Sequence, residues 1–245
     1  MTTFGMTLAT AARVLRQLRH DRRTLAMLVV VPCVLLSLLA WIYDGTPVFD
    51  EIGAPLLGIF PFVVMFLVTS VATLRERTSG TLERLLTMPI GKIDLLLGYA
   101  LAFGLVATVQ AVVATGLAVT LLGLDIAGPL WLLLVVAVCD AVLGMALGLF
   151  LSAFAATEFQ AVQFMPAFVL PQFLLCGLLV PRDELDPVLR FISSLLPLSY
   201  AVDAMRSLTT TEEVDPGAWG DLSVVVLAIL LALGLGAATL RRRTP

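Results

Sequence analysis

One ionisable side chain, Asp140, lies deep inside a long apolar run of the sequence. A carboxyl group is costly in a membrane interior, so it usually faces the inside of a helix bundle or water. Asp140 can therefore hold a proton or a cation, or contact a substrate. It can equally be a neutral or hydrogen-bonded acid that helps helices pack. We favour the packing role because the other apolar runs carry no basic residue in their cores to pair with it.

No other group of side chains has the composition of a catalytic or metal site. The only histidine, His20, lies in a basic N-terminal stretch, so Ser-His-Asp, Cys-His and zinc arrangements lack a member. The three cysteines lie in apolar runs and fit no zinc or redox spacing. The sequence also lacks the G-x-x-x-x-G-K-[ST] pattern of a nucleotide-binding P-loop. We therefore expect a chain that is not an enzyme, with no catalytic residue, metal or bound cofactor.

The composition indicates a membrane protein. Hydrophobic residues make up 60% of the chain and charged residues 13%, whereas about 25% is charged in ordinary soluble domains. Several apolar runs are long enough to be transmembrane helices, which need roughly 20 residues each. The 245 residues leave room for such spans and for no large soluble domain.

These runs predict an all-α membrane protein that forms one domain over residues 1–245. Six transmembrane helices are expected at about residues 25–43, 54–74, 95–122, 129–156, 159–180 and 222–240. Residues 4–23 alternate apolar and basic side chains, which is typical of an amphipathic helix on an anionic cytoplasmic leaflet. Short external helices are expected at about residues 183–208, before the last span.

Prolines and glycines predict how the spans bend and pack. Pro32 is expected to kink the first span, and a neighbouring helix can satisfy the carbonyl that it frees. Pro166 and Pro171 are expected to break the fifth span. Gly144 and Gly148 have the small-xxx-small spacing that permits close helix approach. We expect that approach within one chain; a seam between two chains is the alternative.

A short charged segment between the second and third spans has the pattern of a surface helix. The charges at residues 75–77 end the apolar run before it, because charge is costly in hydrocarbon. Pro89 ends the helix that follows. Leucines at i, i+3 and i+4 share one face of it, namely Leu82, Leu85 and Leu86. From the residues alone, residues 79–89 can be a functional docking helix or an ordinary connection between two spans.

The pattern E-R-x-x-G-T-L-E-R-L-L-x-x-P at residues 76–89 resembles the loop after the second span in permeases of the ABC type-2 exporter family. In that family the loop is a coupling helix that docks on an ATPase subunit. The resemblance therefore implies a docking role for residues 79–89 and the turn before them. The residues that it assigns to coupling are Glu76, Thr81, Leu82, Glu83, Arg84, Leu85 and Leu86.

The resemblance extends over nearly the whole chain. The sequence P-L-S-Y-A-V-D-A-M-R at residues 197–206 is similar to the segment before the last span in the same family, where short helices dip into the outer leaflet. Residues 4–23 correspond to the family's elbow helix. The daunorubicin and multidrug-resistance type of permease is the most similar subgroup, which implies export of a drug, an antibiotic or a lipid-like molecule.

The distribution of basic residues predicts the orientation. Twelve of the 15 basic residues fall in the stretches expected to be cytoplasmic, and three, Arg182, Arg190 and Arg206, fall in the external stretches. Because basic residues concentrate on the cytoplasmic side, both termini are expected inside a plasma membrane that the chain crosses several times.

The resemblance also implies the partners and the substrate path. Two ATPase subunits would hold ATP and Mg²⁺, and a second permease chain, identical or related, would stand beside this one in the bilayer; nothing indicates a nucleic-acid partner. The second and fifth spans would line the path. Its apolar wall would include Phe60, Phe66, Phe159, Phe164, Phe168 and Phe173. The alternatives are that these side chains face lipid, and that the chain is an ion-gradient-driven transporter that uses Asp140.

Overall fold

The computed structural model describes residues 3–79, 91–211 and 215–239, and all regular structure in these ranges is helical. The prediction of an all-α membrane protein is confirmed. The elements are α1 (Thr3–His20), α2 (Arg22–Ile42), α3 (Val48–Thr78), α5 (Lys92–Thr120), α6 (Leu130–Leu151), α7 (Glu158–Leu175), the 3-10 turn η1 (Arg182–Glu184), α8 (Pro187–Leu195), α9 (Pro197–Thr210) and α10 (Pro216–Thr239).

Five helices of the described chain are long and apolar enough to cross a membrane, namely α2, α3, α5, α6 and α10. The pair α8 and α9 is a further candidate, broken by a 94° bend. Helix α7 has 18 residues, among them three glutamines and two prolines, and is not one of these candidates. A multi-pass membrane protein follows from these lengths and compositions.

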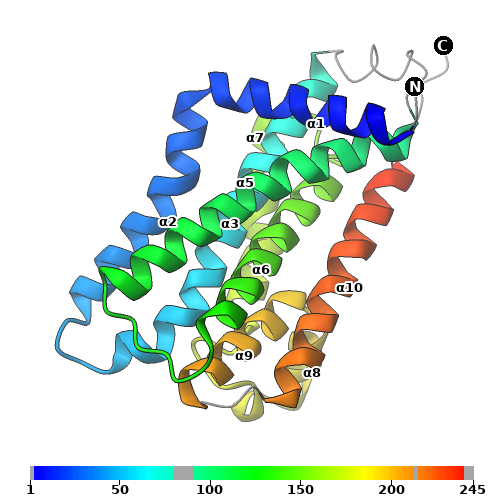
Figure 1. Cartoon of the computed structure of the whole chain (residues 1–245). Coiled ribbons are helices and arrows are strands. Elements are labelled where there is room, and N and C mark those ends of the chain that lie inside the picture. The colour runs from blue at the N-terminus through cyan, green and yellow to red at the C-terminus, as the bar shows by residue number, and fades with distance from the viewer. Residues whose placement is uncertain (1–2, 80–90, 212–214, 240–245) are drawn as a thin grey trace.

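The helices form one bundle with two distinct ends (Figure 1). Helix α1 lies across one end, here called the α1 end, where α3 finishes, α5 begins and α10 finishes. Helices α8 and α9 lie at the opposite end, the α8 end. Helix α7 leads from the α1 end towards α8 and packs against α3.

The centre of the bundle is the contact between α3 and α6, where two glycines of α6 lie against the backbone of α3. A Cβ atom on Gly144 would lie 2.2 Å from the carbonyl oxygen of Phe62, and one on Gly148 would lie 2.5 Å from that of Phe66. No side chain fits at either position, so the two helices touch backbone to backbone. The expected close approach within one chain is confirmed.

The carbonyl group that Pro32 leaves without a helical partner is bonded by a neighbouring helix, as the sequence predicts. Proline has no N–H, so the carbonyl of Leu28, four residues earlier in α2, loses its helical partner. The Nε2 of Gln110, on α5, donates a hydrogen bond of 2.7 Å to that carbonyl oxygen. Both Leu28 and Gln110 are buried, so this bond replaces a missing one where no water can.

Several boundaries differ from those expected. Helix α3 starts at Val48, earlier than residue 54, and its first turn carries Asp50 and Glu51. Helix α6 ends at Leu151, before residue 156, and the chain turns at residues 152–157. The break expected in the fifth span is wrong, because α7 continues through Pro166 and Pro171. The helix ends instead before Gly177, whose φ of +93° suits a residue without a side chain.

The hydrogen bond between α2 and α5 predicts that the stability losses of two substitutions, at Gln110 and at Pro32, do not add. Replacing Gln110 by Leu should lower the stability of the purified protein by about 1–3 kcal/mol, because the Leu28 carbonyl is left buried without a donor. In a Pro32→Ala background the new backbone N–H can reach the same carbonyl, so the Gln110→Leu change should cost much less.

Thermal unfolding of the four proteins in detergent measures this coupling. Thr108→Ala, two residues before Gln110 on α5, is the control, because its hydroxyl donates to the carbonyl of Gly104 in its own helix. Equal losses for Gln110→Leu in the two backgrounds would contradict the assigned role of Gln110.

Candidate functional site

Glu76, in the last turn of α3, is the residue of the expected coupling set that lies in the described chain. Both of its carboxylate oxygens accept hydrogen bonds from the guanidinium of Arg13 on α1, each 3.1 Å long. The side chains of Arg13 and Glu76 are 26% and 14% exposed. A two-point contact of this kind fixes both position and direction, so α1 is held at the point where α3 ends.

Tyr99 of α5 completes this contact. Its hydroxyl accepts a hydrogen bond of 2.9 Å from Nη2 of Arg13, and the guanidinium carbon lies 5.7 Å from the centre of the ring. Gly98 lets α1 approach, since a Cβ there would lie 2.5 Å from the Cβ of Thr10. The cluster Arg13, Glu76 and Tyr99, hereafter the α1 clamp, therefore joins three helices.

A second ion pair joins α3 to α7 at the same end of the bundle. Arg75 donates to Glu158 through Nε at 2.8 Å and Nη2 at 3.0 Å. These side chains are 59% and 51% exposed, so the pair adds little free energy. Its two-point geometry nevertheless orients Glu158, the first residue of α7, against the last turns of α3.

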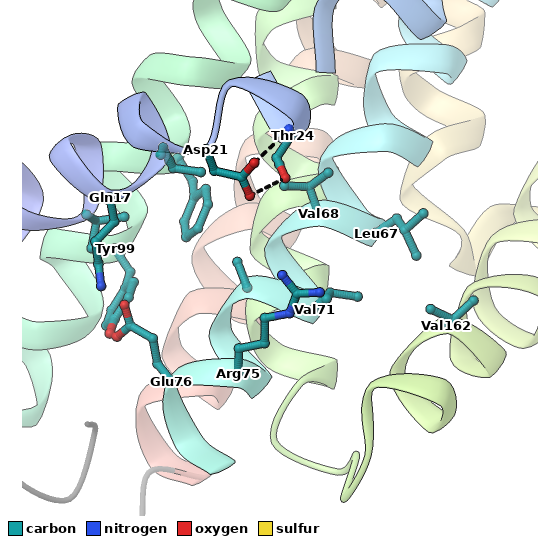
Figure 2. A pocket seen from close by; sticks show the side chains of 14 residues that line it. Gln17, Asp21, Thr24, Leu67, Val68, Val71, Arg75, Glu76, Tyr99 and Val162 are labelled. Atoms are coloured by element: carbon teal, nitrogen blue, oxygen red, sulfur yellow. Dashed lines mark hydrogen bonds between the residues drawn. The ribbon is translucent and has the colours of Figure 1, made fainter. Parts of the chain in front are cut away.

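Between these two ion pairs lies a pocket of ≈ 380 Å³ (Figure 2). Helix α1 and the start of α2 cover one side, and α3 and α5 form much of the remaining wall. Asp21 lies at its edge, and its carboxylate accepts from the backbone N–H of Thr24 at 3.1 Å and from the Thr24 hydroxyl at 2.6 Å. These hydrogen bonds lower the pKa of Asp21, which keeps it ionised.

Asp140 lies at the centre of the bundle and is fully buried. Neither carboxylate oxygen has a hydrogen-bond partner among the described residues. One of them lies beside Gly58 of α3, where a Cβ would be 2.9 Å from Oδ2, and Met205 of α9 closes the same spot. The described chain holds no group of three metal-ligating side chains. The side chain therefore sits at a three-helix junction, and its role stays a prediction.

The α8 end carries its own polar cluster. Arg182 forms an ion pair with Asp203 of α9, and its guanidinium carbon lies 5.0 Å from the centre of the Tyr200 ring. Arg206 donates to the carbonyl of Gly177 at 2.9 Å. Arg190 donates to the carbonyl of Arg182 at 3.1 Å. Each of the three basic residues in the stretch expected outside therefore contacts another residue of that stretch or the end of the helix before it.

The remaining predicted coupling residues lie outside the described part of the chain. They are Thr81, Leu82, Glu83, Arg84, Leu85 and Leu86. The described neighbours of this segment are Ser79, which follows α3, and Gly91, which precedes α5. The helix expected over residues 79–89 is therefore an untested prediction, whereas both of its attachment points lie at the α1 end.

The phenylalanines expected along a substrate path occupy different environments. Phe66 is buried, and Phe60 is partly buried against the same core. Phe159 and Phe168 on α7 are 72% and 47% exposed. Phe164 meets Phe168 edge-on at 6.2 Å between ring centres, and Phe173 packs partly against the core. Phe66 is thus covered within the chain, while α7 presents aromatic side chains outward.

Sequence reasoning missed the α1 clamp. It placed Arg13 among the basic residues that face anionic lipid, and it gave Tyr99 no role. In the structure Val14 and Leu18, apolar residues of this expected surface helix, are buried together with residues of α5. The available signal was Glu76, an acid next to an apolar run, which needs a cationic partner when it is partly buried.

These features define an all-helical, multi-pass membrane protein with a surface helix clamped to its second span. The chain matches the ABC-2 type transporter family over residues 6–209, which takes in α3, the clamp and the bent pair α8 and α9. The protein belongs to that family. This is a family of transport components, in agreement with the expectation of a transport subunit.

Relatives of this chain carry names that agree with this family. A protein called probable multidrug ABC transporter permease YbhR, from Escherichia coli K12, is 26% identical over 188 residues, which are 77% of this chain and 51% of that protein. YbhS, of the same description and strain, is 24% identical over 182 residues, or 74% and 48%. ABC transporter G family member 20 of Dictyostelium discoideum is 26% identical over 159 residues, or 65% and 22%. The chain spans about half the length of the two bacterial relatives.

The α1 clamp predicts a measurable coupling energy. Glu76→Gln and Arg13→Gln should each lower the thermal unfolding midpoint of the purified protein, at a cost of about 1–3 kcal/mol, because each leaves a partly buried charge without its partner. The double variant should lose less than the sum of the single losses. The matched control is the exposed pair, with Arg75→Gln and Glu158→Gln, where we expect a coupling below about 1 kcal/mol. Equal couplings in the two pairs would contradict the clamp.

Proposed function

We propose that this protein is the permease subunit of an ATP-driven exporter and that a separate ATPase subunit docks on residues 79–89. The observation that carries the proposal is the attachment of the last turns of α3. Glu76 is bonded to α1, its partner Arg13 is bonded to α5, and Arg75 is bonded to α7. A displacement of the segment that follows α3 would therefore act on four helices at once.

The proposed assembly contains two ATPase subunits, which hold ATP and Mg²⁺, and two permease chains. The second permease is another copy of this chain or a related one. The membership in the ABC-2 type transporter family supports this arrangement. ATP-driven closure of the ATPases would favour one conformer of the permease pair, which is the requirement for a ligand to shift a conformational equilibrium.

The proposed orientation puts the α1 end in the cytoplasm of a cell bounded by the plasma membrane. Eight of the described basic residues belong to α1, the start of α2, the end of α3 or the start of α5, against three at the α8 end, and the cytoplasmic loops of membrane proteins carry such an excess. Under this orientation both termini and residues 79–89 face the ATPase, and the bent pair α8 and α9 faces the outside.

The proposed substrate is a hydrophobic or amphipathic molecule such as a drug, an antibiotic or a lipid-like compound. Two bacterial relatives are named as multidrug permeases. The outward side of α7, with Phe159, Phe164 and Phe168, offers an aromatic surface of matching character. Two such chains placed with these surfaces towards one another would enclose an apolar path between them.

Substitutions in the expected coupling helix test the docking role. Glu83→Arg or Leu85→Asp should abolish substrate-stimulated ATP hydrolysis by the assembled transporter, because the first reverses a charge and the second places one on the apolar face. Insertion of the permease into the membrane should be unchanged. Glu51→Arg, at the other end of α3, is the control and should retain stimulated hydrolysis. Normal transport by the Glu83→Arg and Leu85→Asp variants would show that the docking role is wrong.

Asp140→Asn separates the proposed exporter from an ion-gradient-driven carrier, the alternative suggested by the buried acid. An ATP-driven exporter needs no proton or cation at this position, so ATP-dependent uptake of substrate into inverted vesicles should persist in the variant. A carrier that uses Asp140 should lose transport driven by a pH or sodium gradient, since the amide cannot take up a proton or carry a negative charge. Loss of gradient-driven transport with ATP absent would favour the alternative.

A further inference from the structure

The pocket beneath α1 carries one charge that no ion pair neutralises. Three charged side chains line it, Asp21, Arg75 and Glu76. Glu76 is paired with Arg13, and Arg75 with Glu158. Asp21 forms no ion pair in the described chain; its hydrogen bonds come from Thr24 and from the backbone of Arg23, and the charge of Arg75 also contributes to lowering its pKa. The five charges together leave one net negative charge, and it is located on Asp21.

The rest of the pocket is apolar. Leu67 and Val71 of α3 and Val162 of α7 form one side, as Figure 2 shows. Phe103 of α5 and Leu18 of α1 form the deeper wall and are themselves buried. A ligand in this pocket would therefore meet aliphatic and aromatic carbon along its length and a carboxylate at one edge.

We propose that this pocket binds a hydrophobic organic cation, with the positive group near Asp21 and the apolar body between α3, α5 and α7. The volume of ≈ 380 Å³ falls within the range of about 300–1,000 Å³ of pockets that hold small organic ligands. The lining is mostly apolar and holds one acid without an ion pair, so its polarity and charge complement those of a hydrophobic cation. Thr24 adds polar atoms beside Asp21, and Gln17 adds them beside Tyr99 and Glu76 (Figure 2).

A zwitterionic phospholipid headgroup fits the same pocket less well. Its phosphate would need a cation with free capacity, whereas the guanidinium groups of Arg13 and Arg75 are each engaged by a carboxylate on two nitrogen atoms. A phosphate would therefore meet guanidinium groups whose positive charge a carboxylate already neutralises. A single positive charge with an apolar body meets instead the acid of the pocket that has no ion pair.

The site is distinct from the path proposed between two chains, because it is formed by α1, α2, α3, α5 and α7 of one chain. The inference does not depend on the proposed export, since it concerns binding to this chain alone. A binding measurement without ATPase or ATP can therefore fail or succeed whatever the transport activity is.

The test is equilibrium binding of radiolabelled tetraphenylphosphonium to the purified full chain in phosphatidylcholine nanodiscs, with empty nanodiscs subtracted. We expect saturable binding at one site per chain. Tetraphenylborate has the same shape and the opposite charge, so it should not bind saturably.

Asp21→Asn should weaken tetraphenylphosphonium binding about tenfold through loss of the charge, while an asparagine still caps α2. Asp44→Asn, an exposed acid beyond the far end of α2, is the control and should bind as the unaltered protein does.

A second variant tests the cavity itself. Ala72→Phe places a large side chain in the pocket wall and should reduce binding without changing any charge. Helix content and elution volume identify variants that have not folded. Equal affinity of the Asp21→Asn and unaltered proteins, equal affinity for the two probes, or no saturable binding would each overturn the proposal. Displacement of the probe by phosphatidylethanolamine in the nanodisc would overturn it too, because the occupant would then be a lipid headgroup.

Discussion

The two-point contact between Arg13 and Glu76 is the interaction on which the arrangement of the α1 end depends. Glu76 closes a transmembrane helix and is 14% exposed, so its charge needs a cation close by. Arg13 supplies that cation from a helix that lies across the bundle, and Tyr99 holds the guanidinium from a third helix. The contact requires the N-terminal helix and the end of α3 to lie on the same side of the membrane.

Within the bundle the constraint is different, because lipid gives helices no hydrophobic reason to associate. The helices are joined instead by close backbone contact and by satisfied polar groups. Gly144 and Gly148 bring α6 onto α3, and Gln110 completes the hydrogen bonding of α2 where Pro32 interrupts it. A well-packed α3 with fixed neighbours can transmit a displacement of its last turn, whereas a loosely held helix would absorb it.

Local sequence signals predicted the helical class, the broken helix pair before the last span and the partner needed at Pro32, because hydropathy, proline chemistry and residue spacing act over short distances. They could not predict that Arg13 faces Glu76 rather than lipid, since these residues are 63 positions apart and a basic surface helix satisfies either arrangement. Nor could they predict an uninterrupted α7, because neighbouring helices can tolerate prolines that local rules treat as breaks. The pocket at Asp21 arises from five helices and has no local signature.

Labelling of single cysteines tests the central claim most directly, namely that the end of α3 and the helix across it face the cytoplasm together. In a background with Cys33, Cys139 and Cys176 replaced, Ser79→Cys should react with a membrane-impermeant maleimide only after the cells are permeabilised, and Thr46→Cys, between α2 and α3, should react in intact cells. Reaction of Ser79→Cys in intact cells would place the coupling segment outside the cell and contradict the account.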